Sequence, residues 1–366
     1  MHFIPAESTL RPTTFYPTTY NGHTYWISPE ERAADSQQFC GKNLIHYSLD
    51  LRKNIDSHVL IITVSAGTCP LASQNMLILS CPSKLQLLEG LLKKSLPQTL
   101  VVHGAVMNIN RGNPAGHEVI VDSWPEFKAV LTRPCREIAS DNADMYTNLY
   151  GAFYRDLDAY RTLLLDTDAV NWDQNLRLYG NQDGIYEVSK DAAVARKAQL
   201  TAIPHFTYFH PNPNKLPQRQ LDPSFTLASL NSSHVDLLNE TWLHGGNEQS
   251  RRYLANIVQW FPTTCILDTN GHPISWSLMD PSGAMGHGYT LPLYRRRGYL
   301  TVAMTAHAMQ AHAAGYPIYG FVALNNVRMQ NLQEHYGFQK LSELCNICIH
   351  SSAYQREEEE RQKYLS

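Results

Sequence analysis

The feature that most constrains this chain is a basic turn that joins a short strand-like run to a long helix without charges. The turn, 294–299, carries three consecutive arginines and a glycine. From 298 to 327 the sequence contains no Asp, Glu, Lys or Arg, and the apolar run 299–314 is typical of a helix buried on most of its circumference. The run 284–291 before the turn alternates in the manner of a strand. The sequence therefore predicts a strand, a basic turn and a buried helix.

Such a turn favours the binding of a phosphate-rich anion. A helix N-terminus presents unpaired backbone N–H groups, and the arginines add positive charge at the same point. We therefore expect Arg295, Arg296, Arg297 and Gly298 to contact an anionic cofactor. The alternative is an ordinary strand-to-helix turn with solvated arginines, because Arg-x-x-Gly alone is a weak motif.

The segments that follow the helix favour the anion site. A buried strand at 318–324 is followed by Asn326, a short helix and the pair Gly337-Phe338. This order resembles the acyl-CoA-binding core of the GCN5-related N-acetyltransferase superfamily, in which the Arg-x-x-Gly turn holds the coenzyme A pyrophosphate. The resemblance implies acyl-CoA as a co-substrate and no tightly bound cofactor. It adds further candidate cofactor-binding residues, namely Tyr289, Leu291, Leu293, Tyr299 and Asn326.

Several other segments resemble the glycine N-acyltransferase family within that superfamily. They are 110–114, 118–127, 144–148, 170–172, 273–276 and 279–282. The resemblance implies an α+β fold with two acetyltransferase-like domains, each a mixed, mostly antiparallel twisted sheet flanked by helices. It also implies an acyltransferase that moves an acyl group from acyl-CoA to the amine of glycine or a related small amino acid. The alternative is an acyl-CoA-binding homologue with little or no turnover.

The position of the catalytic base supports that alternative. The family resemblance places a Glu soon after the Asp-Pro-Ser segment, and the alignment of 280–282 with the basic turn puts Ala284 there. Alanine cannot accept a proton, and His287 is the nearest titratable side chain. In a regular strand these two side chains lie on opposite faces, so His287 serves as the base only if a bulge turns it. Otherwise it packs on the other face.

The chain divides into five parts by composition and resemblance. Residues 1–75 match nothing in the family and form an extension that is either disordered or an artefact of the gene model. An N-terminal domain is expected at 76–203, a Pro- and Asn-rich linker at 204–224, an acyl-CoA-binding domain at 225–352 and a charged tail at 353–366. Within the first domain, the β-branched run 100–110 predicts a strand.

Composition excludes several classes of function. The net charge of −3 does not favour a nucleic-acid partner, and the longest apolar run near the start, 59–64, is too short to span a membrane. Cys345 and Cys348 form a lone C-x-x-C pair that points to opposite faces of a strand, so we expect buried thiols and no metal site. The resemblance implies a mitochondrial location, with the cytoplasm or endoplasmic reticulum as alternatives, and we expect a monomer.

Overall fold

The computed structural model describes residues 16–20, 23–27 and 76–353, and the chain divides into two compact units, Met1–Ala72 and Ser73–Ser366. In the first unit, β1 (Tyr16–Tyr20) pairs antiparallel with β2 (His23–Ile27). The rest of the predicted extension and the charged tail beyond residue 353 lie outside the described residues.

The second unit contains an eight-stranded sheet with the order β13-β8-β14-β7-β6-β5-β4-β3. Only β6 and β7 are parallel among these neighbours, and the other pairs are antiparallel. The strands are β3 (Leu77–Leu79), β4 (His117–Val121), β5 (Ala129–Pro134), β6 (Leu149–Tyr154), β7 (Leu176–Tyr179), β8 (Gln199–His210), β13 (Ile318–Ala323) and β14 (Gln339–Ser351).

Helices cover both faces of this sheet in the N-terminal half. Alternate residues of the strands belong to different buried clusters: Ile120 and Leu131 pack with α4 (Leu157–Leu165) and α5 (Asp183–Ala195). Val119 and Val130 pack with α2 (Pro82–Lys93) and α3 (Leu100–Asn110). The two-residue period of a strand thus produces a sheet buried on both sides.

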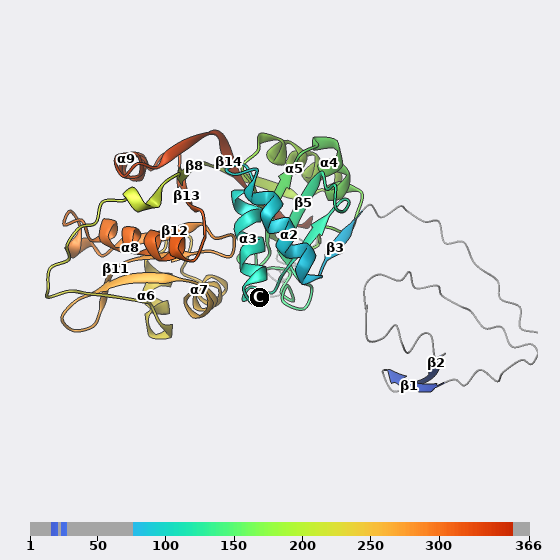
Figure 1. Ribbon diagram of the computed structural model, residues 1–366, viewed down its shortest axis with the longest axis horizontal. Helices are drawn as coiled ribbons and strands as arrows, with labels where there is room; N and C mark the ends of the chain where they lie inside the picture. The colour runs from blue at the N-terminus through green and yellow to red at the C-terminus, as the bar shows by residue number, and fades with distance from the viewer. Residues whose placement is uncertain (1–15, 21–22, 28–75, 354–366) are drawn as a thin grey trace, which may run out of the picture. The chain divides into compact units, whose positions relative to one another are not determined.

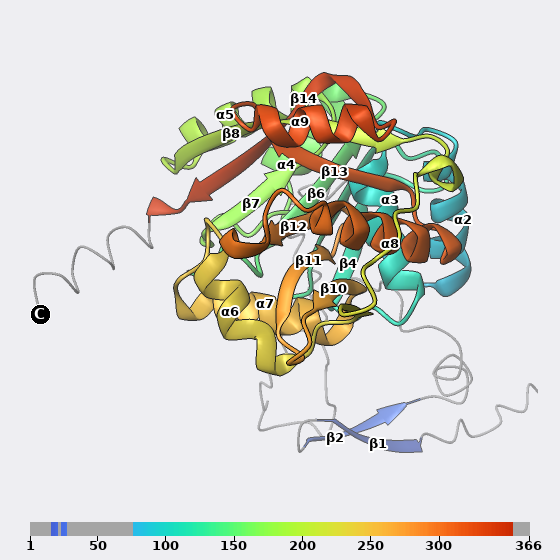
Figure 2. The same ribbon diagram turned by 90° about the vertical axis from the view of Figure 1, so that its left-hand side faces the viewer.

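A second, four-stranded sheet forms the C-terminal half, with the order β12-β11-β10-β9. Its helix α8 covers one face, while α6 and α7 lie on the other (Figure 2). The elements are β9 (Thr226–Ala228), α6 (Val235–Thr241), α7 (Glu248–Trp260), β10 (Thr263–Leu267), β11 (Pro273–Met279), β12 (Met285–Thr290), α8 (Tyr299–Ala313) and α9 (Val327–His335), with short 3₁₀ turns at Pro213–Lys215, Ser232–His234 and Pro292–Tyr294. The predicted α+β class, with mostly antiparallel sheets flanked by helices, is confirmed.

The two halves share the larger sheet, and this corrects the predicted linker. Residues 204–210 are the second part of β8, which pairs with β13 on one side and β14 on the other. β14 in turn lies between β8 and β7 of the N-terminal half. Both long strands therefore pass from one half into the other (Figure 1). The prolines at 204, 211 and 213 suggested a linker, but Pro204 lies in a strand in which its missing N–H is tolerated.

The strand predicted at 100–110 is wrong, because this segment is α3. Residues 100–108 are all buried, so the helix has no polar face whose period could reveal it. Gly104 allows the helix to lie directly against the backbone of Ser282, where a Cβ would collide with its carbonyl oxygen. Asn108 Nδ2 also donates to Pro281 O at 2.9 Å. A buried helix thus joins the two halves next to the loop that precedes β12.

Candidate functional site

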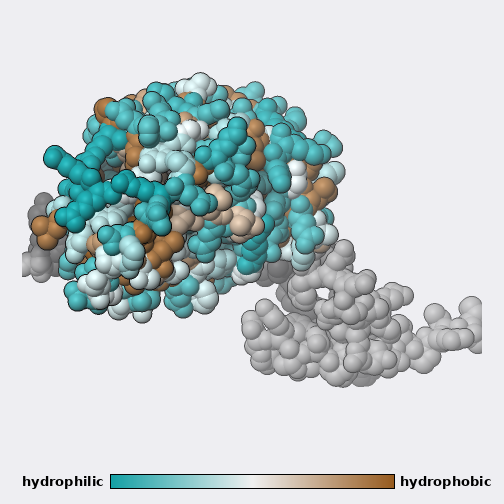
Figure 3. All heavy atoms as spheres, turned by 60° about the vertical axis from the view of Figure 1, so that its left-hand side comes forward, coloured by the Kyte–Doolittle hydropathy of each residue, from teal (hydrophilic) through white to brown (hydrophobic). Residues whose placement is uncertain are grey.

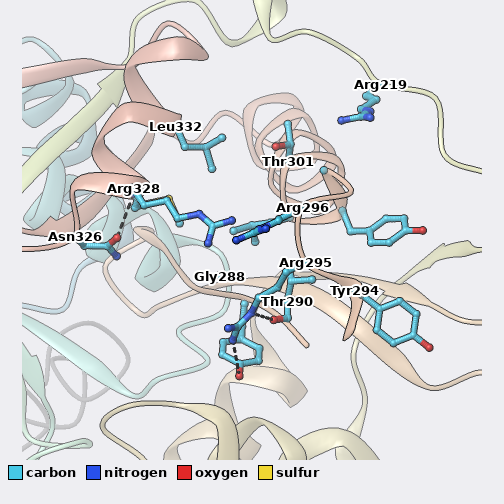
Figure 4. A pocket seen from close by; sticks show the side chains of 15 residues that line it. Arg219, Gly288, Thr290, Tyr294, Arg295, Arg296, Thr301, Asn326, Arg328 and Leu332 are labelled. Atoms are coloured by element: carbon cyan, nitrogen blue, oxygen red, sulfur yellow. Dashed lines mark hydrogen bonds between the residues drawn. The ribbon is translucent and has the colours of Figure 1, made fainter. Parts of the chain in front are cut away.

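A groove of about 560 Å³ opens at the N-terminus of α8. It lies between β12, the basic turn and the start of α9, and Figure 4 shows the side chains that line it. Gly298 has φ +81° and precedes the first residue of α8, and no side chain caps this helix end. The N–H groups of the first turn of α8 are therefore available for an anion.

Four arginines line the groove. The side chains of Arg296 and Arg328 extend toward one another in Figure 4, and Arg219 lies beside Gly298. Arg295 is held on the wall of the groove because its Nε donates to Thr290 O at 3.0 Å and its Nη2 to the Tyr289 hydroxyl at 3.1 Å. None of the four forms an ion pair within the described part of the chain. This concentration of unpaired positive charge suits a ligand with several phosphates.

The strand next to the groove has a free edge. In the sequence, β12 precedes α8 and β13 follows it, but the two strands belong to different sheets. In the N-terminal half, β6 and β7 flank α4 in the same way, and these two strands are hydrogen-bonded to each other as a parallel pair. The two strands of the C-terminal half, β12 and β13, approach each other at Gly320, where a Cβ would meet Met285 O at 2.5 Å. Further along β12, Gly288, Tyr289 and Thr290 line the groove.

The free edge exposes the backbone of Thr290. The N–H of Leu291 donates to Ile274 O at 2.9 Å, so it is not free to bind a ligand. Because antiparallel partners alternate between hydrogen-bonded and non-hydrogen-bonded pairs, Thr290, opposite Ser275, directs its N–H away from β11. The Thr290 N–H therefore points to the free edge of β12, where it is available to a ligand.

Two smaller cavities adjoin the other residues of β12. One, of about 200 Å³, is mostly apolar and shares Gly288 and Tyr289 with the groove; its walls include Leu238, Trp242 and Trp276. The other, of about 190 Å³, is lined by 284–287 together with charged and polar side chains from both halves. Trp242 and His287 separate the two cavities, since both residues line each of them. The seven residues 284–290 thus touch all three spaces.

A bulge places His287 at this junction. Trp276 pairs with Tyr289 but Leu278 pairs with Gly286, so Ser277 lies opposite two residues. His287 takes φ +54° in the bulge and lines the same cavity as Ala284. A role of His287 as the base requires this placement. Burial lowers its pKa to about 4, and the charge of Arg177 acts in the same direction. Its ring packs on Trp242 with centroids 4.6 Å apart. His287 is therefore neutral at pH 7, and its role as a base stays a prediction.

Two family models match the chain: the aralkyl acyl-CoA:amino acid N-acyltransferase family over residues 76–262 and the C-terminal region of that family over 264–347. The chain belongs to this family. The bovine (Bos taurus) glycine N-acyltransferase is 35% identical over 276 residues, which cover 71% of this chain and 94% of the relative. The bovine glycine N-phenylacetyltransferase is 33% identical over 277 residues, with the same coverage of 71% and 94%. The human (Homo sapiens) glycine N-acyltransferase is 33% identical, covering 70% of this chain and 93% of that protein.

A solved structure supports the fold of this N-acyltransferase. The X-ray structure of a Drosophila protein superimposes with a TM-score of 0.62 at 17% identity and covers 76% of this chain and 99% of the other. At this identity the likeness concerns the fold alone.

The predicted cofactor-binding residues of this N-acyltransferase separate into two groups. Those that line the groove are Tyr289, Arg295, Arg296, Gly298, Tyr299 and Asn326. Those that do not are Leu291, Leu293 and Arg297. Leu291 packs in the core, and the Leu293 side chain is 86% exposed. Arg297 is exposed outside the groove, next to Arg296 with its φ of +65°. Asn326 caps α9 by accepting from Met329 N, which gives it a structural task at the rim.

Sequence reasoning missed Arg219 and Arg328. Arg219 lies in the segment interpreted as a linker, and no local pattern connects it with a turn that is 79 positions further along. Arg328 follows Asn326 at the start of α9, so the resemblance that pointed to Asn326 could have found it.

No group of three or more metal-ligating side chains is found in 76–353. Cys345 and Cys348 are buried, and burial raises the pKa of Cys348 to about 11 and that of Cys345 further. Both thiols are therefore protonated and inert. Among the described helices, none combines the length and apolarity that crossing a membrane requires.

Proposed function

We propose that this N-acyltransferase moves the acyl group of an acyl-CoA to the amine of glycine or a related small amino acid. The observation that carries the proposal is the uncapped N-terminus of α8 with its four arginines, next to the free edge of β12. Family membership and the names of the relatives supply the reaction and the acceptor.

In this proposal acyl-CoA is the co-substrate. Its pyrophosphate binds the N–H groups at the start of α8, with Gly298 leaving room for close approach. Its pantetheine arm follows β12, and the Thr290 N–H donates to the thioester carbonyl as negative charge develops on the oxygen. The acyl group enters the apolar cavity beside Trp242 and Trp276. A cavity of this kind favours an aromatic or aralkyl acyl group over acetyl, which agrees with the family description.

The deciding experiment measures thiol release from acetyl-, benzoyl- and long-chain acyl-CoA with a panel of free amino acids. We expect release with glycine or another small amino acid, fastest with an aromatic acyl group. Tight binding of acyl-CoA without thiol release would instead identify the acyl-CoA-binding homologue that Ala284 favours.

Replacing Arg219 with Gln is expected to weaken acyl-CoA binding several-fold. The side chain is exposed, so its charge-assisted contact is partly screened and is worth about 1 kcal/mol. Calorimetric titration at two salt concentrations measures the effect, which should shrink as salt rises. Equal affinities of both proteins at low salt would remove Arg219 from the site.

Replacing His287 with Asn tests the base. Asn tolerates φ > 0 but has no titratable nitrogen. Because the pKa of His287 is lowered to about 4, the ring stays unprotonated through neutral pH, and the variant should keep the shape of the wild-type profile of kcat/KM against pH there. An inflection near the ordinary histidine value of 6.5 that disappears in the variant would show that His287 titrates normally and is the base.

The family resemblance favours mitochondria as the location, and cell fractionation that finds the protein only in the cytosol or endoplasmic reticulum would overturn this. We also expect a monomer, because on the face that Figure 3 shows the hydrophobic residues form small patches among hydrophilic ones. Sedimentation would test the second point.

A further inference from the structure

The polar cavity next to β12 is bounded by the two halves of the protein together. Arg177 comes from β7, His205 from β8 and Ile347 from β14, while Asp280 and 284–287 come from the C-terminal half. It is separate from the groove at α8, but β12 lines both of them. His287 of the bulge lines the cavity, and the next residue, Gly288, lines the groove. A molecule in this cavity therefore lies close to a thioester that follows β12.

Arg177 supplies a fixed positive charge to this cavity. Its Nε donates to Met145 O at 2.9 Å and its Nη2 to Tyr146 O at 3.0 Å. The guanidinium lies over the rings of Tyr146 and Tyr253, at 5.3 and 5.5 Å from their centroids. No carboxylate comes within ion-pair distance of it in the described part of the chain. A half-buried arginine that is held rigidly without an acidic partner is suited to bind the carboxylate of a ligand.

Asp280 supplies a fixed carboxylate to the same cavity. Its Oδ1 accepts hydrogen bonds from Ser282 N at 2.8 Å, Ser282 Oγ at 2.6 Å and Ala284 N at 3.1 Å. The nearest polar partner of Oδ2 is the Tyr179 hydroxyl at 3.5 Å, which leaves this oxygen weakly bonded. Burial raises the pKa of Asp280, which makes it a better proton acceptor than an exposed aspartate. Asp280 and Arg177 thus face one small space without pairing with each other.

We propose that this cavity binds the acceptor amino acid, with Arg177 holding its α-carboxylate and Asp280 accepting a proton from its ammonium. The inference rests on the proposed acyl transfer. It names a binding site for the acceptor and a base, which Ala284, at the position of the family's Glu, cannot supply. Two opposite charges held apart across about 190 Å³ match a small zwitterion. An amine without a carboxylate leaves Arg177 unpaired, so such an acceptor is discriminated against.

The chemical steps balance without any further reagent. Asp280 takes one proton from the ammonium, and the free amine attacks the thioester carbonyl. The new N–C bond forms, the C–S bond breaks, and the thiolate leaves with the second proton of the attacking nitrogen. The proton on Asp280 then passes to water.

The test of Arg177 compares two acceptors in the full chain. Arg177→Gln should lower kcat/KM for glycine by about 10–100-fold, the value of a charged hydrogen bond, and leave that for glycinamide unchanged. The KM for acyl-CoA should not move. Arg251→Gln, an exposed arginine on α7 paired with Asp236, is the matched control and should change neither. An equal loss for glycine and glycinamide in Arg177→Gln would show that the arginine only supports the fold, and no loss would exclude it from the site.

The test of Asp280 uses Asp280→Asn, whose amide oxygen can still accept from Ser282 and Ala284. We expect the rate with glycine to fall about 10²–10⁴-fold, the usual value of a general base. The rate with aminoacetonitrile, whose amine is largely unprotonated at neutral pH, should change little. Equal losses for both amines would reject Asp280 as the proton acceptor.

Two measurements keep the inference testable if a variant is unstable or turnover is absent. The wild-type protein itself must prefer glycine to glycinamide, and equal use of both overturns the proposal. Saturation-transfer NMR in the presence of coenzyme A should detect glycine binding to the wild-type protein but not to Arg177→Gln. Arg177-dependent binding without thiol release would refute the proposed function but support the acceptor site. Thiol release without glycine binding in this cavity would support the proposed function but refute the acceptor site.

Discussion

Acyl-CoA binding is expected to be lost when Gly298 is replaced by Asp. The residue has φ +81°, a conformation that costs Asp more backbone strain than Gly, and an added Cβ would push the flexible guanidinium of Arg219 away from the start of α8. The new carboxylate would also occupy the anion site at the start of α8 and pair with the arginine that should bind the cofactor. Several charge-assisted contacts are lost together, so we expect affinity to fall by more than about 100-fold.

Gly271→Asp is the matched control for this substitution. Gly271 has φ +80°, so the backbone cost is similar, but nothing lies within 4 Å of the added Cβ. Calorimetry with an acyl-CoA should therefore give wild-type affinity for Gly271→Asp and no measurable heat for Gly298→Asp. Unchanged affinity in the Gly298 variant would mean that the cofactor binds elsewhere.

The sequence could predict this turn because its physics is local. Gly298, the arginines and the uncharged helix follow each other directly, and the helix N-terminus needs no distant partner. Two distant cationic side chains could not be found in that way. Arg219 reaches the groove and Arg177 reaches the polar cavity from segments more than 70 positions before Gly298, and only the folded chain brings them there.

His287 lies between these two cases. The sequence predicts His287 as a candidate base on the condition that a bulge turns it, but no local signal fixes where a bulge occurs. The bulge follows from the pairing register of β11 with β12, which depends on the whole sheet. Asp280 was visible in the sequence only as part of a resemblance, because its free Oδ2 and its distance from Arg177 are tertiary features.

The strands shared by the two halves were missed for the same reason. Both β8 and β14 are long, 12 and 13 residues; β8 pairs with β13 and β14, and β14 pairs with β7 as well as with β8. Composition describes 204–224 as a linker because prolines are frequent there, yet the hydrogen bonds of β8 depend on β13 and β14, which lie more than 100 positions later. It follows that the eight-stranded sheet is incomplete without the C-terminal strands β13 and β14.

Truncating Tyr208 is therefore expected to destabilise both halves by the same amount. Tyr208 lies in β8, is fully buried, and pairs with Gly320 of β13 and Lys340 of β14. Its ring belongs to a core that contains Met107 from one half and Leu254 from the other. Tyr208→Ala removes a large aromatic ring from this core, at a cost of about 3–5 kcal/mol.

Hydrogen exchange measured by mass spectrometry along a urea series would follow the two halves separately. Peptides from β5 and from β10 should lose protection at one common urea concentration, and Tyr208→Ala should lower that midpoint equally for both. Tyr208→Phe is the control, because it removes only the hydroxyl that donates to the exposed Glu334 at 2.9 Å and should cost less than about 1 kcal/mol. Two separate midpoints, with only one of them shifted by Tyr208→Ala, would show that the halves fold independently despite their shared strands.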